Sequence, residues 1–170
     1  QYDIEIRTVD LTPVRESAVQ QISAAATLNV SALTNLAPRL RMLTLYAVAA
    51  SENRLVAGTG NRSETYVGYF TKWGDGANDF NPISDLTVTE IYEFLRWLNA
   101  PSCIIEKAPS AGLFDGQTDE QEMGITYEEL DAYLFGGKVS DTAKQTIRRL
   151  HDKSGHKRRG TARFDTGQIE

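Results

Sequence analysis

The sequence is poor in cysteine and has no long apolar run, and both absences limit what the protein can be. Cys103 is the only cysteine among 170 residues, which excludes an intramolecular disulfide framework and a cysteine-based structural zinc site. A reducing, cytosolic setting fits this composition. The longest mainly apolar run, residues 43–50, is far shorter than the roughly 18 residues of a membrane span, so we expect a soluble protein.

The sequence also lacks an initiator methionine and a targeting segment. Residues 1–6 alternate apolar and polar side chains, a strand pattern without the basic start and apolar centre of a signal peptide. We therefore expect a processed or incomplete chain. Apolar residues make up 41% and charged residues 24% of the sequence, which is enough for one packed domain without a disulfide to stabilise it.

Charge is distributed unevenly along the chain. Residues 144–163 carry eight Lys or Arg against one acid, a net +7, which leaves −12 on the rest of a chain whose total is −5. Nucleic-acid binding is driven by a broad basic face, and this chain is acidic apart from its basic end, so nucleic acid is not predicted as a partner. A membrane is not predicted either, because no apolar run is long enough to span one. A basic end of this kind can instead bind one small polyanion.

The order of the predicted elements favours an α/β fold with a parallel sheet. Strands are expected over residues 2–9 and 55–57, the second buried on both faces, with a helix over 13–26 between them. A last helix is expected to begin at Ser140 and to end at Gly155.

Three more helix starts follow from capping patterns. The apolar stripe over residues 35–50 predicts a long helix, with Asn35 as its cap and Pro38 tolerated in its first turn. Thr87 and Thr126 each begin a Thr-x-x-Glu capping box in front of apolar residues at helical spacing.

A glycine-rich turn, residues 58–64, follows the second predicted strand. Such turns lie at the carboxyl edge of a parallel sheet, where open α/β folds bind ligands and backbone amides approach anions closely. Ser63 and Glu64 are expected to open a helix there. An ordinary strand-to-helix turn with a solvated Glu64 is the alternative.

The long loop over residues 68–82 is a second candidate site, because long loops in compact domains are often functional. Lys72 could hold a phosphate. Asp75 and Asp79 could hold a hydroxyl, an amine or Mg²⁺. The alternative is a solvated loop whose aromatic residues pack into the core.

Two weaker candidates lie further along the chain. In residues 107–113 a turn places the Ser110 hydroxyl where it could contact a ligand, but an ordinary connecting loop is the simpler interpretation. The basic residues 156–159 follow the last predicted helix and could close over a polyanion, although a frayed basic end explains them equally well.

Together these segments resemble one family, the ammonia-dependent NAD synthetases, over residues 35–165. The resemblance is carried by Pro-Arg-Leu-Arg-Met at 38–42, Leu-Val-Ala-Gly-Thr-Gly-Asn-Arg-Ser-Glu at 55–64, Gly-Tyr-Phe-Thr-Lys-Trp-Gly-Asp-Gly at 68–76, Asn-Pro at 81–82, Lys-Ala-Pro-Ser at 107–110, Gly-Ile-Thr-Tyr-Glu-Glu-Leu-Asp at 124–131 and His-Lys-Arg at 156–158. The ordered combination is specific, because no single segment predicts the others.

The resemblance implies a Rossmann-like fold of the adenine nucleotide alpha hydrolase type, with a parallel sheet flanked by helices. It also implies a cytoplasmic, homodimeric ligase. ATP, bound with Mg²⁺, would adenylate the nicotinic acid carboxylate of deamido-NAD, and ammonia would then displace AMP to give NAD. Because the triphosphate and the carboxylate repel each other, Mg²⁺ and basic side chains are needed to offset their charge.

The resemblance assigns roles to eight residues and names no catalytic residue. Glu64 resembles a Mg²⁺ ligand, and Thr59 and Ser110 resemble contacts of ATP. The residues that resemble deamido-NAD contacts are Arg39, Lys72, Asp79, His156 and Lys157.

Two departures from the family pattern matter. Val88 stands where the family often has an ATP-binding lysine, so phosphate binding is expected to be weaker or to use another cation. The phosphate loop Ser-Gly-Gly-x-Asp-Ser of this fold is absent, and residues 1–10 resemble a later strand of its sheet. We therefore expect residues 1–170 to be the C-terminal portion of a single domain whose first strand and phosphate loop lie upstream.

Two other interpretations stay open. The chain could be a non-catalytic fragment or remnant that binds nucleotides or forms dimers. Another ATP pyrophosphatase, such as a GMP synthetase, fits poorly because residues 70–76 resemble those of NAD synthetases. The long helix with Arg39 resembles the family's dimer interface, so a homodimer with ATP, deamido-NAD and ammonia as ligands is the favoured prediction.

Overall fold

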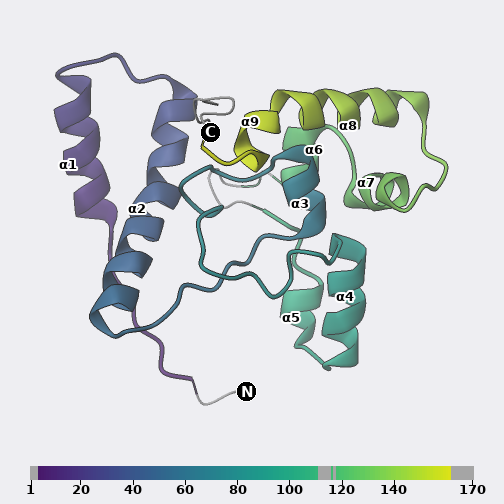
Figure 1. Cartoon of the computed structure of the whole chain (residues 1–170), viewed down its shortest axis with the longest axis horizontal. Coiled ribbons are helices and arrows are strands. Elements are labelled where there is room, and N and C mark those ends of the chain that lie inside the picture. Colours follow the sequence, from purple (N-terminus) through teal and green to yellow (C-terminus); the bar gives the residue numbers. More distant parts are fainter. Residues whose placement is uncertain (1–3, 111–115, 117, 162–170) are drawn as a thin grey trace, which may run out of the picture.

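The computed structural model describes residues 4–110, 116 and 118–161, and helices joined by long connections dominate it (Figure 1). The helices are α1 (Thr12–Ser23), α2 (Val30–Ser51), α3 (Arg62–Val67), α4 (Val88–Trp97), α5 (Ser102–Ile105), α6 (Asp119–Met123), α7 (Tyr127–Leu134), α8 (Asp141–Lys153) and α9 (Gly155–Arg158). α1 and α2 form an antiparallel pair at one side, and α3–α9 gather at the other. No helix in the described part of the chain is long and apolar enough to cross a bilayer.

The predicted sheet is not confirmed, because the described residues form no strand. The segment predicted as a strand over residues 2–9 is irregular where it is described, and Ile6 is 86% exposed. The second predicted strand contributes only an isolated parallel bridge between Ala57 and Phe80, and Leu55 is 70% exposed rather than buried. A strand satisfies its backbone hydrogen bonds through neighbouring strands, and within the described residues the segment has a single bridge partner.

The helix predicted over residues 13–26 forms as α1, whereas α2 begins earlier than predicted. Asn29 is the cap of α2, and its side chain accepts a hydrogen bond from the Ala32 backbone N–H at 2.8 Å. The predicted cap, Asn35, lies inside the helix, as does Pro38. An interior proline costs roughly 3 kcal/mol, so tertiary packing must offset it, and Pro38 is buried.

The capping patterns give the correct starts of the other long helices. In α4 and α7 the caps Thr87 and Thr126 and their glutamates form complete capping boxes. Ser140 caps α8 by accepting a hydrogen bond from the Ala143 backbone N–H at 3.1 Å. α8 ends at Lys153 with Ser154 as its C-cap, so Gly155 follows the end of that helix as predicted, and it also begins the short α9.

The hydrophobic core lies among α3, α4, α6, α7 and α8. Its two fully enclosed aliphatic residues are Leu130 of α7 and Ile147 of α8, both 0% exposed. Burying a side chain of this size contributes about 1.5 to 3 kcal/mol. The buried apolar members are Val67, Val88, Met123, Ile125, Tyr127, Leu130 and Ile147. Because Val67 ends α3, the core supports the helix on which Glu64 lies.

Gly68 allows the end of α3 to approach the end of α8. Its φ of 72° lies in the left-handed region, and a Cβ there would lie 2.1 Å from the Ser154 Cβ. A glycine is therefore required at this position. The close approach brings α9 against α3, as Figure 1 shows.

Candidate functional site

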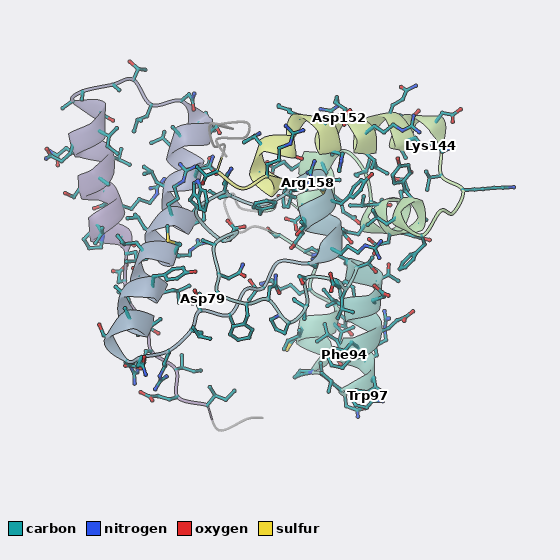
Figure 2. The ribbon with its side chains drawn as sticks, in the orientation of Figure 1. Asp79, Phe94, Trp97, Lys144, Asp152 and Arg158 are labelled. Carbon is teal, nitrogen blue, oxygen red and sulfur yellow. The ribbon has the colours of Figure 1, made fainter. Side chains whose placement is uncertain are left out.

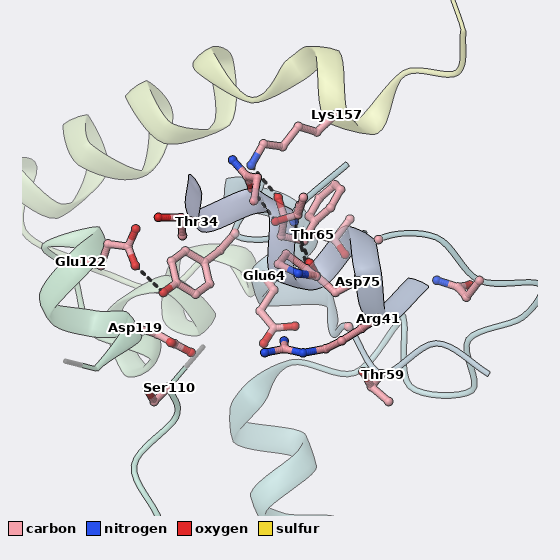
Figure 3. Close-up of a pocket in the computed structure, with 18 of the residues that line it drawn as sticks. Thr34, Arg41, Thr59, Glu64, Thr65, Asp75, Ser110, Asp119, Glu122 and Lys157 are labelled. Carbon is pink, nitrogen blue, oxygen red and sulfur yellow. Dashed lines mark hydrogen bonds between the residues drawn. The ribbon is translucent and has the colours of Figure 1, made fainter. Parts of the chain in front are cut away.

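A cavity of about 860 Å³ lies between α2 and the α3–α9 group. Four of the predicted site residues line it together, namely Thr59, Glu64, Ser110 and Lys157 (Figure 3). They come from the glycine-rich turn, the start of α3, the segment before α6, and α9. Residues that are far apart in the sequence thus meet around one space.

Glu64 is fixed by the capping box of α3. Its Oε2 accepts a hydrogen bond from the Asn61 backbone N–H at 2.9 Å, and its own N–H donates to Asn61 Oδ1 at 2.9 Å. Burial raises the pKa of Glu64 to about 7; the Asn61 hydrogen bonds oppose this, and the charges of Asp119 and Asp75 add to it. The side chain is therefore an acid whose ionised form a nearby cation would stabilise.

Two tyrosine–carboxylate pairs lie on the α6 side of the cavity, which is lined by Tyr69, Glu122 and Asp119. The Tyr69 hydroxyl donates to Glu122 Oε2 at 2.7 Å, and the Tyr127 hydroxyl donates to Asp119 Oδ2 at 3.1 Å. Burial, with the neighbouring carboxylates, raises the pKa of both phenols, so both remain protonated donors. Asp119 and Glu122 were not predicted as site residues, because acids that follow a Thr-x-x-Gln pattern are typical of an ordinary helix start.

The residues present suit a magnesium ion that is held largely by substrate. No group of three or more His, Cys, Asp or Glu side chains that could hold a metal occurs in the part of the chain that the structure describes. Mg²⁺ usually binds one or two carboxylates together with substrate phosphates and water. The partly buried Glu64 carboxylate at the cavity wall fits that mode of binding.

Arg41, not Arg39, is the arginine of α2 that lines the cavity. Residues two apart on a helix point in directions about 200° apart, so the two side chains cannot share a face. Arg39 instead approaches the Lys72 carbonyl oxygen, with an N–O distance of 3.5 Å. Both arginines belong to the motif at residues 38–42, and nothing in the sequence indicates which of them faces the cavity.

Lys72 and Lys157 hold the C-terminal segment against the loop through reciprocal contacts. Lys72 Nζ donates to the carbonyl oxygens of His156 at 2.6 Å and Arg159 at 3.3 Å. Lys157 Nζ donates to the carbonyl oxygens of Gly68 and Phe70. Burial lowers the pKa of Lys157, while the charge of Asp75 opposes that effect. An anionic ligand must compete with these carbonyl oxygens.

Four of the predicted residues lie outside the lining of the cavity: Arg39, Lys72, Asp79 and His156. Asp79 accepts hydrogen bonds from the Val56 backbone N–H at 2.7 Å and the Tyr46 hydroxyl at 3.4 Å, and so joins α2 to the connecting segments (Figure 2). His156 is exposed.

Val88, which stands where the family resemblance would place an ATP-binding lysine, is a core residue and is 7% exposed. The cations among the lining residues are Arg41, Lys157 and Arg158. Arg158 donates to the carbonyl oxygens of Tyr66 and His151, at the ends of α3 and α8. Arg41 makes no hydrogen bond or ion pair within the described residues, which leaves its charge facing the cavity.

Comparison with known proteins points in one direction. The family model described as NAD synthase matches residues 1–161. An NH(3)-dependent NAD(+) synthetase from Carboxydothermus hydrogenoformans is 58% identical over 128 residues, which cover 75% of this chain and 53% of the relative. A second NH(3)-dependent NAD(+) synthetase, from Mannheimia succiniciproducens, is 43% identical over 159 residues, which cover 91% of this chain and 64% of the relative. The chain thus spans about half to two thirds of the length of these curated relatives.

The chain is also similar to solved structures with two different names. A structure of NMN synthetase from Francisella tularensis superposes with a TM-score of 0.91 at 42% identity, covering 95% of this chain and 67% of that one. An NH3-dependent NAD synthetase from Campylobacter jejuni gives a TM-score of 0.70 at 27% identity, covering 92% of this chain and 64% of that one.

Proposed function

The chain belongs to the NAD synthase family, and on that premise we propose that it is part of an ammonia-dependent ligase that converts deamido-NAD into NAD. The observation that carries the proposal is the meeting of Thr59, Glu64, Ser110 and Lys157 around one cavity. The family resemblance assigns these residues separately to ATP, Mg²⁺ and the dinucleotide. Their proximity supports a single reaction site for all three ligands.

The reaction has two steps. A carboxylate oxygen of the nicotinate attacks the α-phosphorus of ATP, the bond to the β-phosphate oxygen breaks, and pyrophosphate leaves. Ammonia then attacks the acyl carbon of the adenylate, loses a proton and expels AMP, which leaves the amide. A water-excluding cavity favours ammonia over hydrolysis of the adenylate.

The residues of this chain would bind and orient the reactants. Glu64 is suited to hold Mg²⁺, which when bound neutralises charge on the triphosphate. Thr59 and Ser110 would contact ATP. Lys72 and Lys157 would bind phosphate oxygens of deamido-NAD in place of backbone carbonyl oxygens, so the net gain is smaller than the about 1.5 to 3 kcal/mol of one charge-assisted hydrogen bond. Arg39, Asp79 and His156 are proposed to complete the deamido-NAD site.

We also propose that the chain is the C-terminal portion of a single domain and that the protein is a homodimer. Ile6 and Leu55 are 86% and 70% exposed. The relatives are longer than this chain, and strands formed by the additional part of such a protein would cover both residues in a parallel sheet. Leu43 and Val48 of α2 are 61% and 40% exposed, which supports α2 as the dimer surface.

Amidation of nicotinate mononucleotide to NMN is a second candidate. The observation that favours it is the likeness to the Francisella tularensis NMN synthetase, whose TM-score of 0.91 exceeds the 0.70 of the Campylobacter jejuni NAD synthetase. The chemistry of the two reactions is the same, because only the group attached to the nicotinate ribose phosphate differs.

The test uses the full-length protein with ATP, Mg²⁺, ammonia and either deamido-NAD or nicotinate mononucleotide. We expect NAD with equal amounts of AMP and pyrophosphate, and a lower rate with the mononucleotide. Glu64→Gln should lower turnover, whereas Glu93→Gln, on the exposed face of α4 outside the cavity, should not. A faster reaction with the mononucleotide would select the second candidate. Amide formation from neither acid would refute both.

A further inference from the structure

A hydrogen-bond network begins at Ser63, the residue before Glu64, and uses none of the residues assigned to ligands; it is buried at Ser63 and Asp131 and reaches the surface at Thr89. The Ser63 hydroxyl, 0% exposed, donates to Asp131 Oδ1 at 2.5 Å, and Asp131 is 2% exposed. Asp131 Oδ2 accepts from the Thr89 backbone N–H at 2.8 Å and the Thr89 hydroxyl at 2.7 Å. Ser63 Oγ also accepts from the Val88 backbone N–H at 3.2 Å.

The network joins the starts of two helices to a third. Ser63 is the second residue of α3, Thr89 is the second residue of α4, and Asp131 lies on α7. The Arg62 backbone N–H also donates to the Leu86 carbonyl oxygen at 2.9 Å, which ties the two helix starts together a second time. The buried carboxylate is stabilised by two hydroxyls and by the first-turn amide of α4, where the helix dipole favours negative charge.

The orientation of α3 depends on such contacts because the helix has only six residues. The capping box fixes the Glu64 carboxylate relative to its own helix but not relative to the rest of the molecule. Ser63 is the residue before Glu64, and neighbouring Cα atoms lie about 3.8 Å apart. A shift of Ser63 away from Asp131 therefore also displaces Glu64, which lines the cavity.

We propose that Asp131 is a positioning residue that acts through Ser63 to hold Glu64 where a divalent cation and a nucleotide phosphate meet. The inference rests on the proposed function, in which Glu64 is the Mg²⁺ ligand. Residues that orient a metal ligand typically change metal affinity by about 10- to 100-fold when they are replaced. Asp131 acts at one remove, so we expect the lower end of that range.

The test measures metal binding directly, without turnover. Mn²⁺ binding to the full-length protein, with a non-hydrolysable ATP analogue, is followed by electron paramagnetic resonance in the wild type and in Asp131→Asn and Ser63→Ala. We expect both substitutions to raise the dissociation constant of Mn²⁺ about tenfold. The double variant should bind Mn²⁺ no more weakly than the weaker single variant, because both substitutions act through the same contact between Ser63 and Asp131.

Ile147→Val is the matched control. Ile147 is 0% exposed in the same core but has no polar side-chain group, so its truncation lowers stability without touching the network. Each variant is measured equally far below its own melting temperature. An unchanged Mn²⁺ affinity in both Asp131→Asn and Ser63→Ala, or an equal loss of affinity in Ile147→Val, would overturn the proposal. If Asp131→Asn does not fold, Ser63→Ala decides alone.

The outcomes separate this proposal from the proposed function. Amide formation by the wild type tests the function, and Mn²⁺ affinity tests the positioning. A protein that forms no amide but loses Mn²⁺ affinity in Asp131→Asn would refute the function and retain the positioning role. Unchanged Mn²⁺ affinity in Glu64→Ala would remove the ligand on which the positioning role depends and refute it.

Discussion

Glu64 belongs to the capping box of α3 and also faces the cavity, and these two roles have opposite effects on its charge. The hydrogen bonds of the capping box favour the carboxylate, whereas burial favours the neutral acid and dominates. Glu90 occupies the same position in the capping box of α4, yet hydrogen bonds from Thr87 lower its pKa. The same local pattern thus gives opposite shifts, because only Glu64 is enclosed by the tertiary structure.

The raised pKa of Glu64 predicts a pH-dependent effect of Glu64→Gln on stability. Below the ordinary pKa of 4.5 the acid is neutral in both states, and between 4.5 and about 7 only the unfolded chain loses the proton. The free energy of unfolding of the wild type therefore falls as pH rises through this window. Glutamine keeps the capping box and does not titrate. We expect Glu64→Gln to gain stability relative to the wild type from pH 4.5 to 7, measured by denaturant unfolding with EDTA.

Glu90→Gln is the matched control for that measurement. Because the pKa of Glu90 is lowered, its carboxylate contributes stability that is present above its ordinary pKa and lost as pH falls through the folded value. Glu90→Gln should therefore lose stability relative to the wild type on the higher-pH side. The same pH trend in both variants would contradict the assigned shifts.

Arg41 offers the charge that Val88 cannot. It lines the cavity without a partner among the described side chains, and the aliphatic Val88 is buried in the core. We expect Arg41→Met to weaken ATP binding about tenfold, the effect of losing one charge-assisted hydrogen bond. The measurement is isothermal titration calorimetry with ATP on the full-length protein. Arg54→Met, which removes an exposed charge outside the cavity, is the control, and equal affinities in the two variants would contradict the prediction.

At the scale of elements, the junction between α3 and α8 depends on Gly68. A Cβ at Gly68 would overlap the Ser154 side chain at 2.1 Å and would also occupy the left-handed region. Gly124 has the same left-handed φ, +73°, but no atom lies within 4 Å of the position that a Cβ would take there. Replacing either glycine by alanine therefore costs free energy for the left-handed backbone, whereas only the replacement of Gly68 also creates a steric clash.

Gly68→Ala should accordingly destabilise the protein more than Gly124→Ala. The backbone cost alone is about 1 to 3 kcal/mol in each case, and overpacking adds a similar amount at residue 68. Thermal unfolding of the two full-length variants provides the comparison. Because Lys157 Nζ binds the Gly68 carbonyl oxygen, Gly68→Ala should also speed amide exchange in α9. Equal melting temperatures for the two variants would show that the close approach is not formed.

At the scale of the whole molecule, the exposed apolar residues Ile6 and Leu55 predict that their segments pair with strands of a sheet that the described residues do not form. If residues 4–9 and 55–57 join a sheet, their backbone amides in the full-length protein should exchange at least about 100-fold more slowly than in an unstructured chain. Hydrogen exchange followed by mass spectrometry gives this result peptide by peptide. Exchange at the unstructured rate in both segments would count against the sheet.

The proposed dimer can be tested on α2. Leu43 is 61% exposed, and a charge introduced there would oppose burial against a second copy. We expect the full-length protein to sediment as a dimer and Leu43→Asp to sediment as a monomer with an unchanged circular dichroism spectrum. Val14→Asp on α1, which is 48% exposed, provides a comparison on the neighbouring helix. A monomeric wild type would refute the proposal.

Most helix starts could be predicted from the sequence, and the start of α2 could not. The side chains of Thr87, Thr126 and Ser140 each accept a hydrogen bond from the backbone N–H three residues later, so the pattern that predicts each helix start spans only four residues. The α2 prediction failed because Asn35 and Pro38 form an equally good local start. The interior Pro38 is accepted only because it is buried. The strand predictions were weaker still, because pairing depends on partners elsewhere in the chain.

For the site, the sequence by itself determined which residue types are present and, through the ordered motifs, the family. It singled out Glu64, Thr59, Ser110 and Lys157, which meet in one cavity. The tertiary structure alone decided that Arg41 rather than Arg39 faces that cavity and that Asp131 supports Ser63 from 68 residues away. The physical reason is one of range. Caps and turns are fixed by neighbours along the chain, whereas burial, charge environment and cavity walls are set by residues that only folding brings together.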